Sequence, residues 1–533
     1  MDSVARRIVS LGRRGLLRGA TAAAALAAIT PSGGTQVLAQ PAFTDDPFSQ
    51  GVASGDPWPD SVVLWTRLAP PVTTGRRLPN RPIACGWEVA EDDRFTRILR
   101  QGTAIAHPEL GHALHVTVDG LAPGRRYAYR FHAGGVASPV GHTRTAPAPD
   151  ATPDQLRFAV AGCQHWEHGF FTAWDDIAQD AALDFVFHYG DYIYEYAARA
   201  APPAIRPHLG DETYTLTEYR DRYALYRSDS ALRRAHAAHP FLMSFDDHEV
   251  DNNWAGAWSE EDGSRAHPVA VPPEVFALRK QIAFQAWYEA MPVRQTMRPN
   301  GPSITAWRGL RWGRLADIAV LDTRSHRDDQ PCGDGTRPPC PDLDDPSRRM
   351  LGANQESWLR ERLVRPDSIW KLVAQQVPMM RRDLGTGGPV LSMDKWDGYP
   401  AARARLLGAL HQGKVRNLAV LAGDIHQSWA GALHLDPRDP TSPVVGHEFV
   451  ATSITSGGDG SDVPSNGARL LARNPHVAWI GNRRGYNLHQ VTARGMTVTS
   501  RMVERVSVPG APMRDAARFV VEADNPRLHR EPV

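Results

Sequence analysis

The stretch DFVFHYGDYIYEY, residues 184–196, joins an apolar run to a group of titratable side chains. The opening DFVF has the length of a strand, and Gly190 and Asp191 after it are typical of a turn, because Asp accepts hydrogen bonds from its own downstream backbone. Alternating tyrosines and a glutamate surround and follow this turn. The stretch therefore predicts a buried strand whose end presents titratable and phenolic side chains.

Further apolar runs of strand length occur along the chain. They are LRFAVAG (156–162), PFLMSF (240–245), DIAVL (317–321) and NLAVLAG (417–423). Such near-continuous apolarity is expected of strands covered on both faces. Apolar residues at three- and four-residue intervals predict helices over residues 170–181, 276–290 and 354–364. The alternation predicts an α/β domain with a well-buried sheet, and two alternating runs, 444–454 and 496–503, predict strands of a second sheet.

Polar and titratable side chains follow the apolar runs. They are Cys163, Asp191, Tyr194, Asp247, His248, Asn253, Asp322, Asp424 and His426. Ligands of α/β sheets gather beyond the carboxyl ends of the strands, so we expect a common site there. Several carboxylates buried together would be costly without cations, because they lose solvation and repel one another. The cluster therefore predicts a metal centre.

The ligand types indicate which metals the centre holds. Carboxylate and amide oxygens suit hard divalent cations such as Ca²⁺, Mg²⁺ or Mn²⁺. A tyrosine phenolate and a cysteine thiolate suit a more acidic ion that removes their protons, and Fe³⁺ is such an ion. Zn²⁺ would take the Cys and the His but has little need of a tyrosine. We therefore predict a mixed centre with one iron and one or more hard divalent ions.

The chain before residue 154 has a different pattern from the rest. Its short alternating runs are SVVLWTRL (61–68), IACGWEVA (83–90), HALHVTVDGL (112–121) and RRYAYRFHAG (125–134). These runs predict an immunoglobulin- or fibronectin-like β-sandwich over residues 43–148. A Pro-rich linker, residues 145–154, leads into a catalytic domain over residues 154–510. Residues 511–533 are expected to be a C-terminal tail.

The first 39 residues have the layout of an export signal. GRRGLLRG (12–19) resembles the twin-arginine signal, and a short Ala-rich stretch follows it. The apolar stretch from Ala20 to Ile29 is about half the ~20 residues that cross a bilayer, so we expect no transmembrane segment. We predict export by the twin-arginine machinery to the periplasm or the medium. The formal net charge of +1 offers no field for nucleic acid.

Three of the four cysteines are expected to have structural roles. Cys332 and Cys340 bracket a turn-rich loop, and in an oxidising compartment we expect them to form a disulfide. Cys85 is interpreted as a small buried apolar side chain. Only Cys163, at a strand end, is left for the metal centre.

Several of these segments together resemble one known family. AGCQHWEHGFFTAWDDIAQD, LDFVFHYGDYIYEY, FDDHEVDNNWAG and LAGDIHQSWAG resemble the PhoD-like alkaline phosphatase family, in that order and at comparable spacing. The resemblance covers nearly all of the chain after residue 39. It implies an αββα-sandwich metallophosphoesterase domain, similar to those of the calcineurin-like and purple-acid-phosphatase-like proteins. It also implies a site with Fe³⁺ and Ca²⁺, one iron with one or two calcium ions.

The resemblance implies roles for the residues at the strand ends. The segment GDYIY would make Asp191 the carboxylate that bridges the metals and Tyr194 the phenolate on iron. Cys163 stands where the first strand supplies a ligand. The segment DDHE would place Asp247 on the divalent metal and His248 beside the substrate phosphate.

Further positions complete the implied site. Asn253, or its neighbour Asn252, would be another metal ligand, and Asp424 and His426 of GDIH would complete the metal centre. Arg484, in NRRGY, would clamp a phosphate oxygen, the alternative being an exposed arginine at a helix end.

Other residues near the motifs are interpreted as scaffold. Asp322 is expected to cap a turn, and Tyr192 and Tyr196 are expected to pack in the core. His165 and Trp166 are expected to form the pocket wall.

The implied function is an exported metal-dependent phosphoesterase, an alkaline phosphatase and phosphodiesterase that scavenges phosphate. A metal-activated hydroxide would attack small-molecule phosphate esters, and His248 would give a proton to the leaving alkoxide. One alternative is a phospholipase D-type phosphodiesterase that acts on phospholipid head groups. Another is a non-catalytic binding protein with structural metals, which would have no need of His248.

Overall fold

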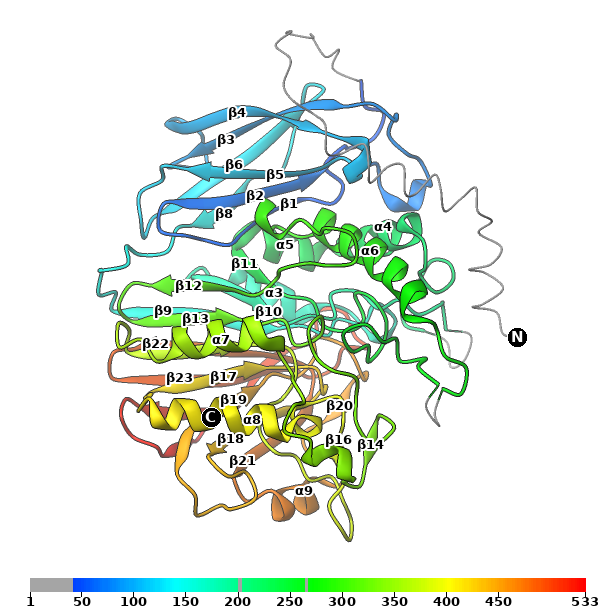
Figure 1. Ribbon diagram of the computed structural model, residues 1–533. Coiled ribbons are helices and arrows are strands. Elements are labelled where there is room, and N and C mark those ends of the chain that lie inside the picture. The colour runs from blue at the N-terminus through cyan, green and yellow to red at the C-terminus, as the bar shows by residue number, and fades with distance from the viewer. Residues whose placement is uncertain (1–41, 200–203, 264–266) are drawn as a thin grey trace.

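A computed structural model describes residues 42–199, 204–263 and 267–533 of the chain. The twin-arginine signal predicted for residues 1–39 lies outside the described residues. Two large sheets share an apolar core, helices lie over their outer faces, and a β-rich front region lies at the top of Figure 1. Within the described ranges no helix is long and apolar enough to cross a membrane.

The first large sheet has ten strands, and the strand at residues 184–187 predicted above lies inside it. β10 (Phe185–His188) runs parallel to β9 (Gln155–Ala161) on one side and to β11 (Pro240–Met243) on the other. Every residue of β10 is buried, as strands covered on both faces require. The remaining strands of this sheet are β1 (Val52–Gly55), β2 (Ser61–Arg67), β5 (Ala113–Asp119), β22 (Gly485–Thr492), β23 (Gly495–Val503), β24 (Met513–Glu522) and β25 (Leu528–Glu531).

The second large sheet has eight strands and contains the other apolar runs. Its parallel centre consists of β13 (Ala316–Val320), β15 (Trp370–Ala374), β17 (Leu418–Ala422) and β19 (Val444–Val450). Its remaining strands are β12 (Arg308–Trp312), β18 (Ser428–His434), β20 (Gly460–Ser461) and β21 (Val477–Arg483). The expectation of one sheet for all five apolar runs is wrong, and β23 belongs to the first sheet. Apolarity indicates burial on both faces, which strands of either sheet share.

Successive side chains of these strands pack into different cores. In β10, Phe185 and Phe187 pack between the sheets, whereas Val186 packs toward the helices on the outer face. In β17, Leu421 packs between the sheets and Val420 packs toward the helices on the other side. This period of two follows from the pleat of a strand. Each sheet is therefore covered by apolar side chains on both faces.

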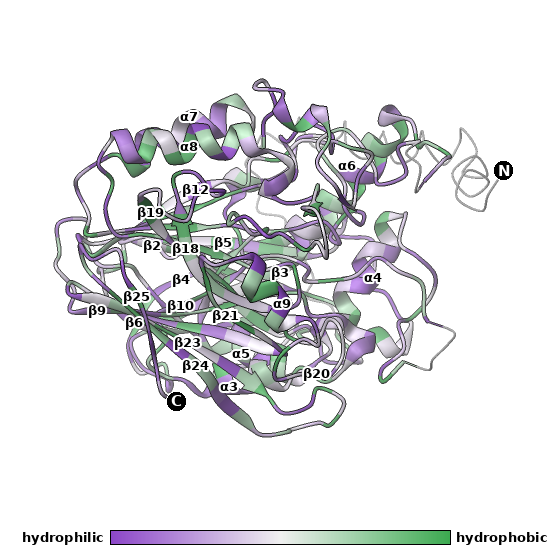
Figure 2. Ribbon diagram, turned by 90° about the horizontal axis from the view of Figure 1, so that it is seen from below, coloured by the Kyte–Doolittle hydropathy of each residue, from purple (hydrophilic) through white to green (hydrophobic). Residues whose placement is uncertain are grey.

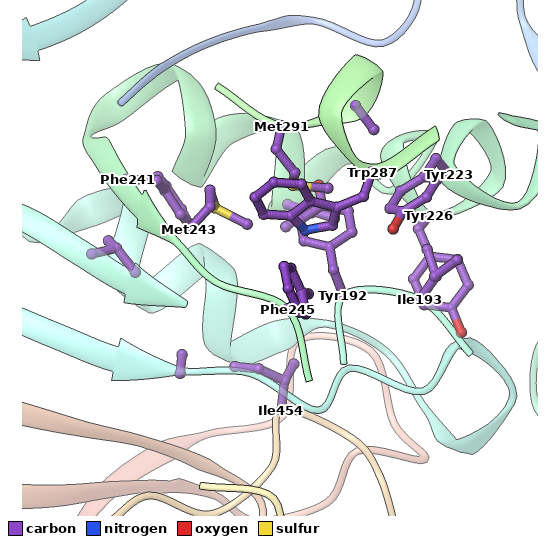
Figure 3. Close-up of a cluster of buried hydrophobic side chains, with 14 of the residues drawn as sticks. Tyr192, Ile193, Tyr223, Tyr226, Phe241, Met243, Phe245, Trp287, Met291 and Ile454 are labelled. Atoms are coloured by element: carbon purple, nitrogen blue, oxygen red, sulfur yellow. The ribbon is translucent and has the colours of Figure 1, made fainter. Parts of the chain in front are cut away.

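Two groups of helices cover the outer faces. The first sheet is covered by α3 (Thr172–Gln179), α4 (Leu216–Arg227), α5 (Ser230–Ala238) and α6 (Pro273–Ala290). The second is covered by α7 (Gly352–Leu363) and α8 (Pro400–Gln412), which carry hydrophilic and hydrophobic residues in turn (Figure 2), while α9 (Gly467–Arg473) lies against β21. Under α6, Trp287 packs edge-on against Phe245 (Figure 3). The predicted helices are confirmed as α3, α6 and α7.

The β-rich front region is joined to the rest through a common sheet. Its own sheet contains β3 (Ile83–Ala90), β4 (Ile98–Ala106), β6 (Arg126–Ala133), β7 (Val136–Ala137) and β8 (Gly141–Arg144). Its other strands, β1, β2 and β5, extend the first large sheet, because β1 pairs in parallel with β11, with Ser54 opposite Pro240. All four strands predicted for this region are confirmed.

The end of the chain is a structured edge of the first sheet. Residues 511–533, expected to be a tail, form β24 and β25, which pair antiparallel with β23 and with each other. Phe519 and Val521 are buried between the two large sheets, so the expectation of a tail is wrong.

The expectations for the cysteines of the scaffold are confirmed. Cys332 and Cys340 form a disulfide, in the loop where β14 (Thr336–Arg337) pairs with β16 (Leu391–Ser392). Cys85 is fully buried as a free thiol.

Candidate metal centre

The strand ends of both large sheets meet at one place. β9 leads to Cys163, β10 to Asp191, β11 to Asp247 and β17 to Asp424 and His426. Their ligand atoms form overlapping groups, each within 4.8 Å: Cys163, Asp191 and His426; Asp191, Asp247 and His248; Asp246, Asp247 and Asp424. Asp191 is thus shared by two of these groups, one on each side of it.

One side of Asp191 carries sulfur, phenol and imidazole. The thiol of Cys163 donates to Asp191 Oδ2 over 3.2 Å, and the hydroxyl of Tyr194 donates to the same oxygen over 2.9 Å. Tyr194 Oη also lies 3.2 Å from His426 Nε2 and 2.6 Å from Ser456 Oγ. The thiol and the phenol therefore converge on one carboxylate oxygen, and the imidazole of His426 contacts the phenol.

The environment keeps protons on the sulfur and the phenol. Burial, and next the negative charge of Asp191, raise the pKa of Cys163 and of Tyr194 well above their usual values. Both groups are then hydrogen-bond donors to Asp191. A multivalent cation reverses this electrostatic balance, because it favours the deprotonated thiolate and phenolate that would bind it.

The backbone at this site adopts an unusual conformation. The φ angle is positive at Cys163 (51°), Asp191 (54°), Asn253 (51°), Asp424 (70°) and His426 (55°). Non-glycine residues adopt this left-handed region rarely and at a cost, and such residues cluster at active sites. The strain requires the surrounding structure to hold these turns in place.

Glu249 supplies some of that support. Its carboxylate accepts hydrogen bonds from the backbone N–H groups of Asp191 (3.1 Å), Tyr192 (2.7 Å) and Asp246 (2.9 Å). Burial raises the pKa of Glu249 to about 7. The turn after β10 and the turn after β11 are thus held by one side chain.

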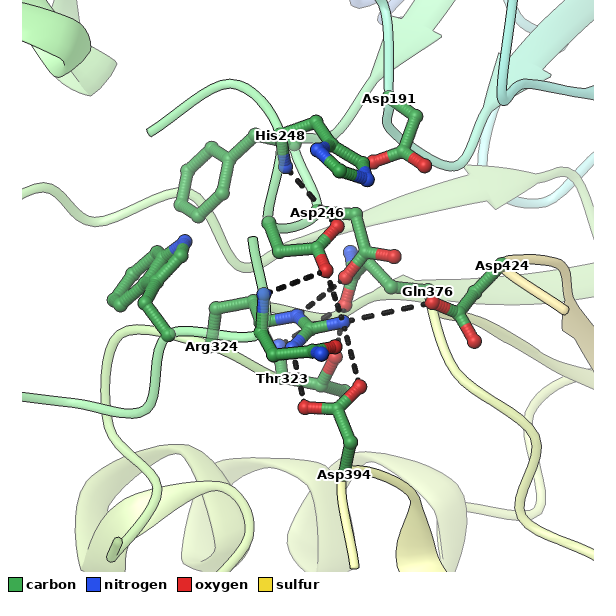
Figure 4. Close-up of polar contacts among 12 residues, drawn as sticks. Asp191, Asp246, His248, Thr323, Arg324, Gln376, Asp394 and Asp424 are labelled. Atoms are coloured by element: carbon green, nitrogen blue, oxygen red, sulfur yellow. Dashed lines mark hydrogen bonds and ion pairs between the residues drawn. The ribbon is translucent and has the colours of Figure 1, made fainter. Parts of the chain in front are cut away.

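The other side of Asp191 is rich in carboxylates. The guanidinium of Arg324, fully buried, donates to Asp246 and Asp394 (Figure 4). Although burial opposes ionisation of Asp247, the positive charges of Arg324 and His248 hold the pKa of Asp247 well below its usual value. Asp247 is therefore ionised, which is the form that binds a cation.

Asn253 approaches this group through its backbone. Its N–H donates to Asp247 Oδ2 over 3.0 Å, while its side-chain amide donates to Glu260 over 2.9 Å. The amide of Asn252 donates to Glu260 as well, over 2.7 Å. Neither amide contacts a carboxylate of the three ligand groups in the described structure, so the ligand role of Asn253 stays a prediction.

His248 is held by a carboxylate that sequence reasoning missed. Its Nδ1 donates to Glu195 Oε2 over 2.8 Å, and Glu195 is 1% exposed. Burial favours the neutral ring, but Glu195 and then Asp247 raise the pKa of His248 well above its usual value. The signal for Glu195 was its place in DFVFHYGDYIYEY, next to Tyr194.

The outer tyrosines of that stretch behave differently from each other. Tyr192 is fully buried in the core beneath the helices, as expected. Tyr196 is 39% exposed, and its ring lies edge-on 5.2 Å from the ring of His248, so the expectation of core packing is wrong for Tyr196. On the wall, His165 packs against the Tyr194 ring at 4.3 Å.

Arg484 and Asp322 are both turn-stabilising residues in this structure. Arg484 lies in the turn from β21 to β22, 3% exposed, and donates to the carbonyl oxygen of His426 and to Ser453. It is therefore not an exposed arginine at a helix end, and its role as a phosphate clamp stays a prediction. Asp322 accepts from the N–H groups of Arg324 (3.0 Å) and Ser325 (2.8 Å), which confirms the turn cap.

Comparison with known proteins identifies the class first. The chain is 44% identical to alkaline phosphatase D of Bacillus subtilis (strain 168) over 502 residues, which is 93% of this chain and 85% of that protein. It also superimposes on a solved structure of PhoD with a TM-score of 0.88 and 44% identity, covering 92% of this chain and 93% of that one. The protein is a phosphatase, a hydrolase of phosphate esters.

The family models make the assignment specific. The pattern of the PhoD-like phosphatase family matches residues 158–500, and the pattern of that family's N-terminal domain matches residues 34–147. The chain belongs to the PhoD-like phosphatase family. The resemblance drawn from the strand-end motifs is thereby confirmed, and the reading as a non-catalytic binding protein is set aside.

Proposed function

We propose that the protein is an exported alkaline phosphatase and phosphodiesterase that holds Fe³⁺ and Ca²⁺ among the strand ends. The observation that carries this proposal is the position of Asp191 between two ligand groups. One of its oxygens, Oδ1, is buried and has no hydrogen-bond partner among the described residues. A buried carboxylate oxygen without a partner is costly, so a cation bound there fits the site.

The donor set supports iron on the first side of Asp191. Cys163, Tyr194 and His426 would hold Fe³⁺ together with Asp191, as a thiolate, a phenolate and a neutral imidazole. Burial lowers the pKa of His426 to about 3, so its ring is neutral and able to bind metal at physiological pH.

Oxygen donors support calcium on the second side. Asp247 and Asp424 would hold Ca²⁺ with Asp191 as the shared carboxylate, and Asn253 would add an amide oxygen after turning away from Glu260. Carboxylate and amide oxygens are the donors that a hard divalent cation prefers.

When bound, these ions would activate a water molecule and neutralise the charge of the transferring phosphate. His248, oriented through Nδ1 by Glu195, would give a proton from its other ring nitrogen to the leaving oxygen. Tyr196, at the exposed side of His248, would contact the alcohol moiety of the substrate. Arg484 would act on the phosphate directly or through the His426 turn that it holds.

The same proposal extends to architecture and export. The two helix-covered sheets support an αββα-sandwich catalytic domain over residues 154–510, with residues 43–148 as a β-sandwich in front of it. The signal-like residues 1–39 support export through the twin-arginine machinery to the periplasm or the medium. This route carries a folded protein, so the metals would be bound before export.

The test is metal analysis and activity of protein exported by its own signal. We expect iron and calcium, a visible tyrosinate-to-iron absorption, and loss of hydrolysis in EGTA that added Ca²⁺ restores. Asp191→Asn should lose the absorption and the activity, whereas Asp367→Asn, in an ion pair with Arg311, should keep both. A colourless enzyme that is indifferent to EGTA would overturn the metal assignment.

Substrate choice separates this proposal from its alternative. Nitrophenyl phosphate, bis(nitrophenyl) phosphate and a phosphatidylcholine vesicle should be compared at equal enzyme concentration. We expect the soluble esters to be hydrolysed faster. Faster release of the lipid head group would favour the phospholipase D-type activity.

A further inference from the structure

Arg227, the last residue of α4, is a fully buried cation. Its Nη2 donates to the carbonyl oxygen of Ala290 over 3.1 Å, whereas its Nε and Nη1 have no hydrogen-bond partner among the described residues. No carboxylate within the described ranges forms an ion pair with Arg227, and Asp229 pairs with Arg206 at 2.5 Å instead. A buried guanidinium that lacks a counter-ion is costly, because burial removes its hydration.

Aromatic rings surround this guanidinium but do not neutralise it. Its Cζ lies 4.3 Å from the centre of the Trp65 ring in β2 and 5.7 Å from that of Tyr192 in the turn after β10. Both side chains are fully buried, and Tyr192 belongs to the apolar core drawn in Figure 3. The faces of such rings attract a cation, but indole and phenol are uncharged at physiological pH. The positive charge of Arg227 is therefore not balanced by these neighbours.

The ring of His188, at the end of β10, supplies a further donor. Its Nδ1 accepts from the backbone N–H of Gly190 over 3.2 Å. Burial, and next the charge of Arg227, lower the pKa of His188 to about 3, so the ring is neutral and its single proton lies on Nε2. This Nε2 is buried and has no hydrogen-bond partner among the residues that the structure describes.

Tyr192 is the common neighbour of these groups. The centre of its ring lies 5.7 Å from Arg227 Cζ, 5.2 Å from the centre of the His188 ring and 5.8 Å from that of His236 in α5. Its hydroxyl lies 3.1 Å from His236 Nε2, and Nδ1 of His236 is another buried nitrogen without a partner in the described part of the chain. Because Arg227 and His188 offer N–H groups beside a positive charge, this place suits an anion.

We propose that a chloride ion is bound beside Arg227, where it accepts hydrogen bonds from Nε–H and Nη1–H of the guanidinium and from Nε2–H of His188. An anion supplies a negative charge and an acceptor together, whereas a water molecule supplies only the acceptor. A monoatomic ion suits the site because Arg227, His188 and Tyr192 are fully enclosed. His188 and Tyr192 flank the turn that carries Asp191, so the chloride stabilises that turn. The inference does not depend on which metals the centre holds.

The first test compares melting temperatures in sodium chloride and in sodium methanesulfonate at equal ionic strength. The methanesulfonate anion is too large for an enclosed monoatomic site. A ligand that binds only the folded chain raises its stability, so the natural protein should melt at least about 2 °C higher in chloride. Arg227→Met should melt at the same temperature in both salts. Arg234→Met, which removes an exposed arginine that pairs with Asp175 on the same side of the sheet, should keep the difference.

The second test needs no variant, so it decides the matter even if Arg227→Met does not fold. Crystals of the natural protein grown with bromide in place of chloride should show an anomalous difference peak beside Nε and Nη1 of Arg227. Absence of that peak, or equal melting temperatures of the natural protein in the two salts, would overturn the inference and leave ordered water as the partner of these donors. A chloride effect that persists in Arg227→Met would overturn it as well.

Discussion

Two neighbouring residues of the GDYIYEY segment, Tyr194 and Glu195, contact different parts of the site. Tyr194 turns toward Asp191 and His426, whereas Glu195 turns toward His248. One residue therefore serves the predicted iron and the next serves the predicted proton donor. A carboxylate on the far ring nitrogen fixes the orientation of a histidine and its tautomer.

Removing the charge of Glu195 should lower kcat/KM by an amount that depends on the leaving group of the ester. We expect Glu195→Gln to lower kcat/KM for an alkyl phosphate by about 10- to 100-fold, because a poor leaving group needs the proton of His248. A nitrophenyl ester should lose far less, since nitrophenolate leaves without a proton. Steady-state kinetics with both esters measure this difference.

A matched control separates this effect from a general loss of structure. Glu356→Gln removes a carboxylate that pairs with Arg405 at the surface helices and should leave both esters unaffected. The iron content of Glu195→Gln should equal that of the natural protein. An equal loss for the two esters would contradict the role of His248 as proton donor.

At the scale of elements, one ring joins the ends of the two sheets. Tyr189, just after β10, lies between Gly162 at the end of β9 and Gly423 at the end of β17, and its hydroxyl donates to Thr452 O over 3.0 Å. A Cβ on either glycine would overlap the ring. These glycines are required because the ring and backbone lie so close, and the contact positions β17 beside β10.

Gly423→Ala should therefore separate the ligand groups. The added methyl group would push Asp424 and His426 away from Asp191, at a cost of about 1–3 kcal/mol for overpacking. We expect a lower melting temperature and iron content below that of the natural protein. Gly408→Ala, in α8 with open space around it, should be neutral or slightly stabilising. Full iron content in Gly423→Ala would contradict the inference that the Tyr189 ring positions β17 beside β10.

β22 carries a histidine that makes the sheet packing sensitive to acid. His489 is fully buried, stacks on Phe158 at 4.9 Å, and has no hydrogen-bond partner for either ring nitrogen among the described residues. Burial lowers its pKa to about 3, against about 6.5 in an unfolded chain. The stability that it contributes is complete above pH 6.5 and is lost as the pH falls from 6.5 toward 3.

His489→Phe should remove this sensitivity. As the pH falls from 6.5 to 5.0, the natural protein loses about 2 kcal/mol of unfolding free energy, because His489 stays neutral when folded but binds a proton when unfolded. A phenyl ring binds no proton, so the variant has no such loss. We expect melting temperatures at pH 7.5 and pH 5.0 to differ less in His489→Phe than in the natural protein. His529→Phe, on the exposed face of β25, should leave the difference unchanged. An unchanged difference in His489→Phe would contradict the prediction.

For the whole molecule, the local sequence pattern predicted where strands lie, but not which strands pair with one another. Apolar runs located the central strands, and strand-end chemistry correctly predicted that Cys163, Asp191 and His426 lie together. Sheet membership did not follow, because a strand buried on both faces looks the same in either sheet. Glu195 and Arg324 were missed because their partners are 53 and 78 residues away. Ion pairs of that range leave no periodic trace in a sequence.

The continuous sheet joins the front region to the catalytic region through hydrogen bonds between strands. β1 and β11 share a parallel pairing, Trp65 Nε1 donates to Glu289 O over 3.0 Å, and Arg308 Nε donates to Asp56 over 2.7 Å. A fragment of residues 154–533 would expose the edge of β11, whose residues are all buried in the complete chain. An unpaired, apolar strand edge favours aggregation. The two family patterns thus divide a chain that its hydrogen bonds do not.

We therefore expect a single cooperative thermal transition for the complete chain and an insoluble 154–533 fragment. Val63→Asp buries a charge in β2, which lies two strands along the sheet from β11. It should lower the temperature of the single transition, and the iron absorption should disappear at that same temperature. Calorimetry and visible absorption, recorded on the same sample, measure this coincidence. Separate transitions for the two regions, or a soluble and active 154–533 fragment, would show that the shared sheet does not couple their folding.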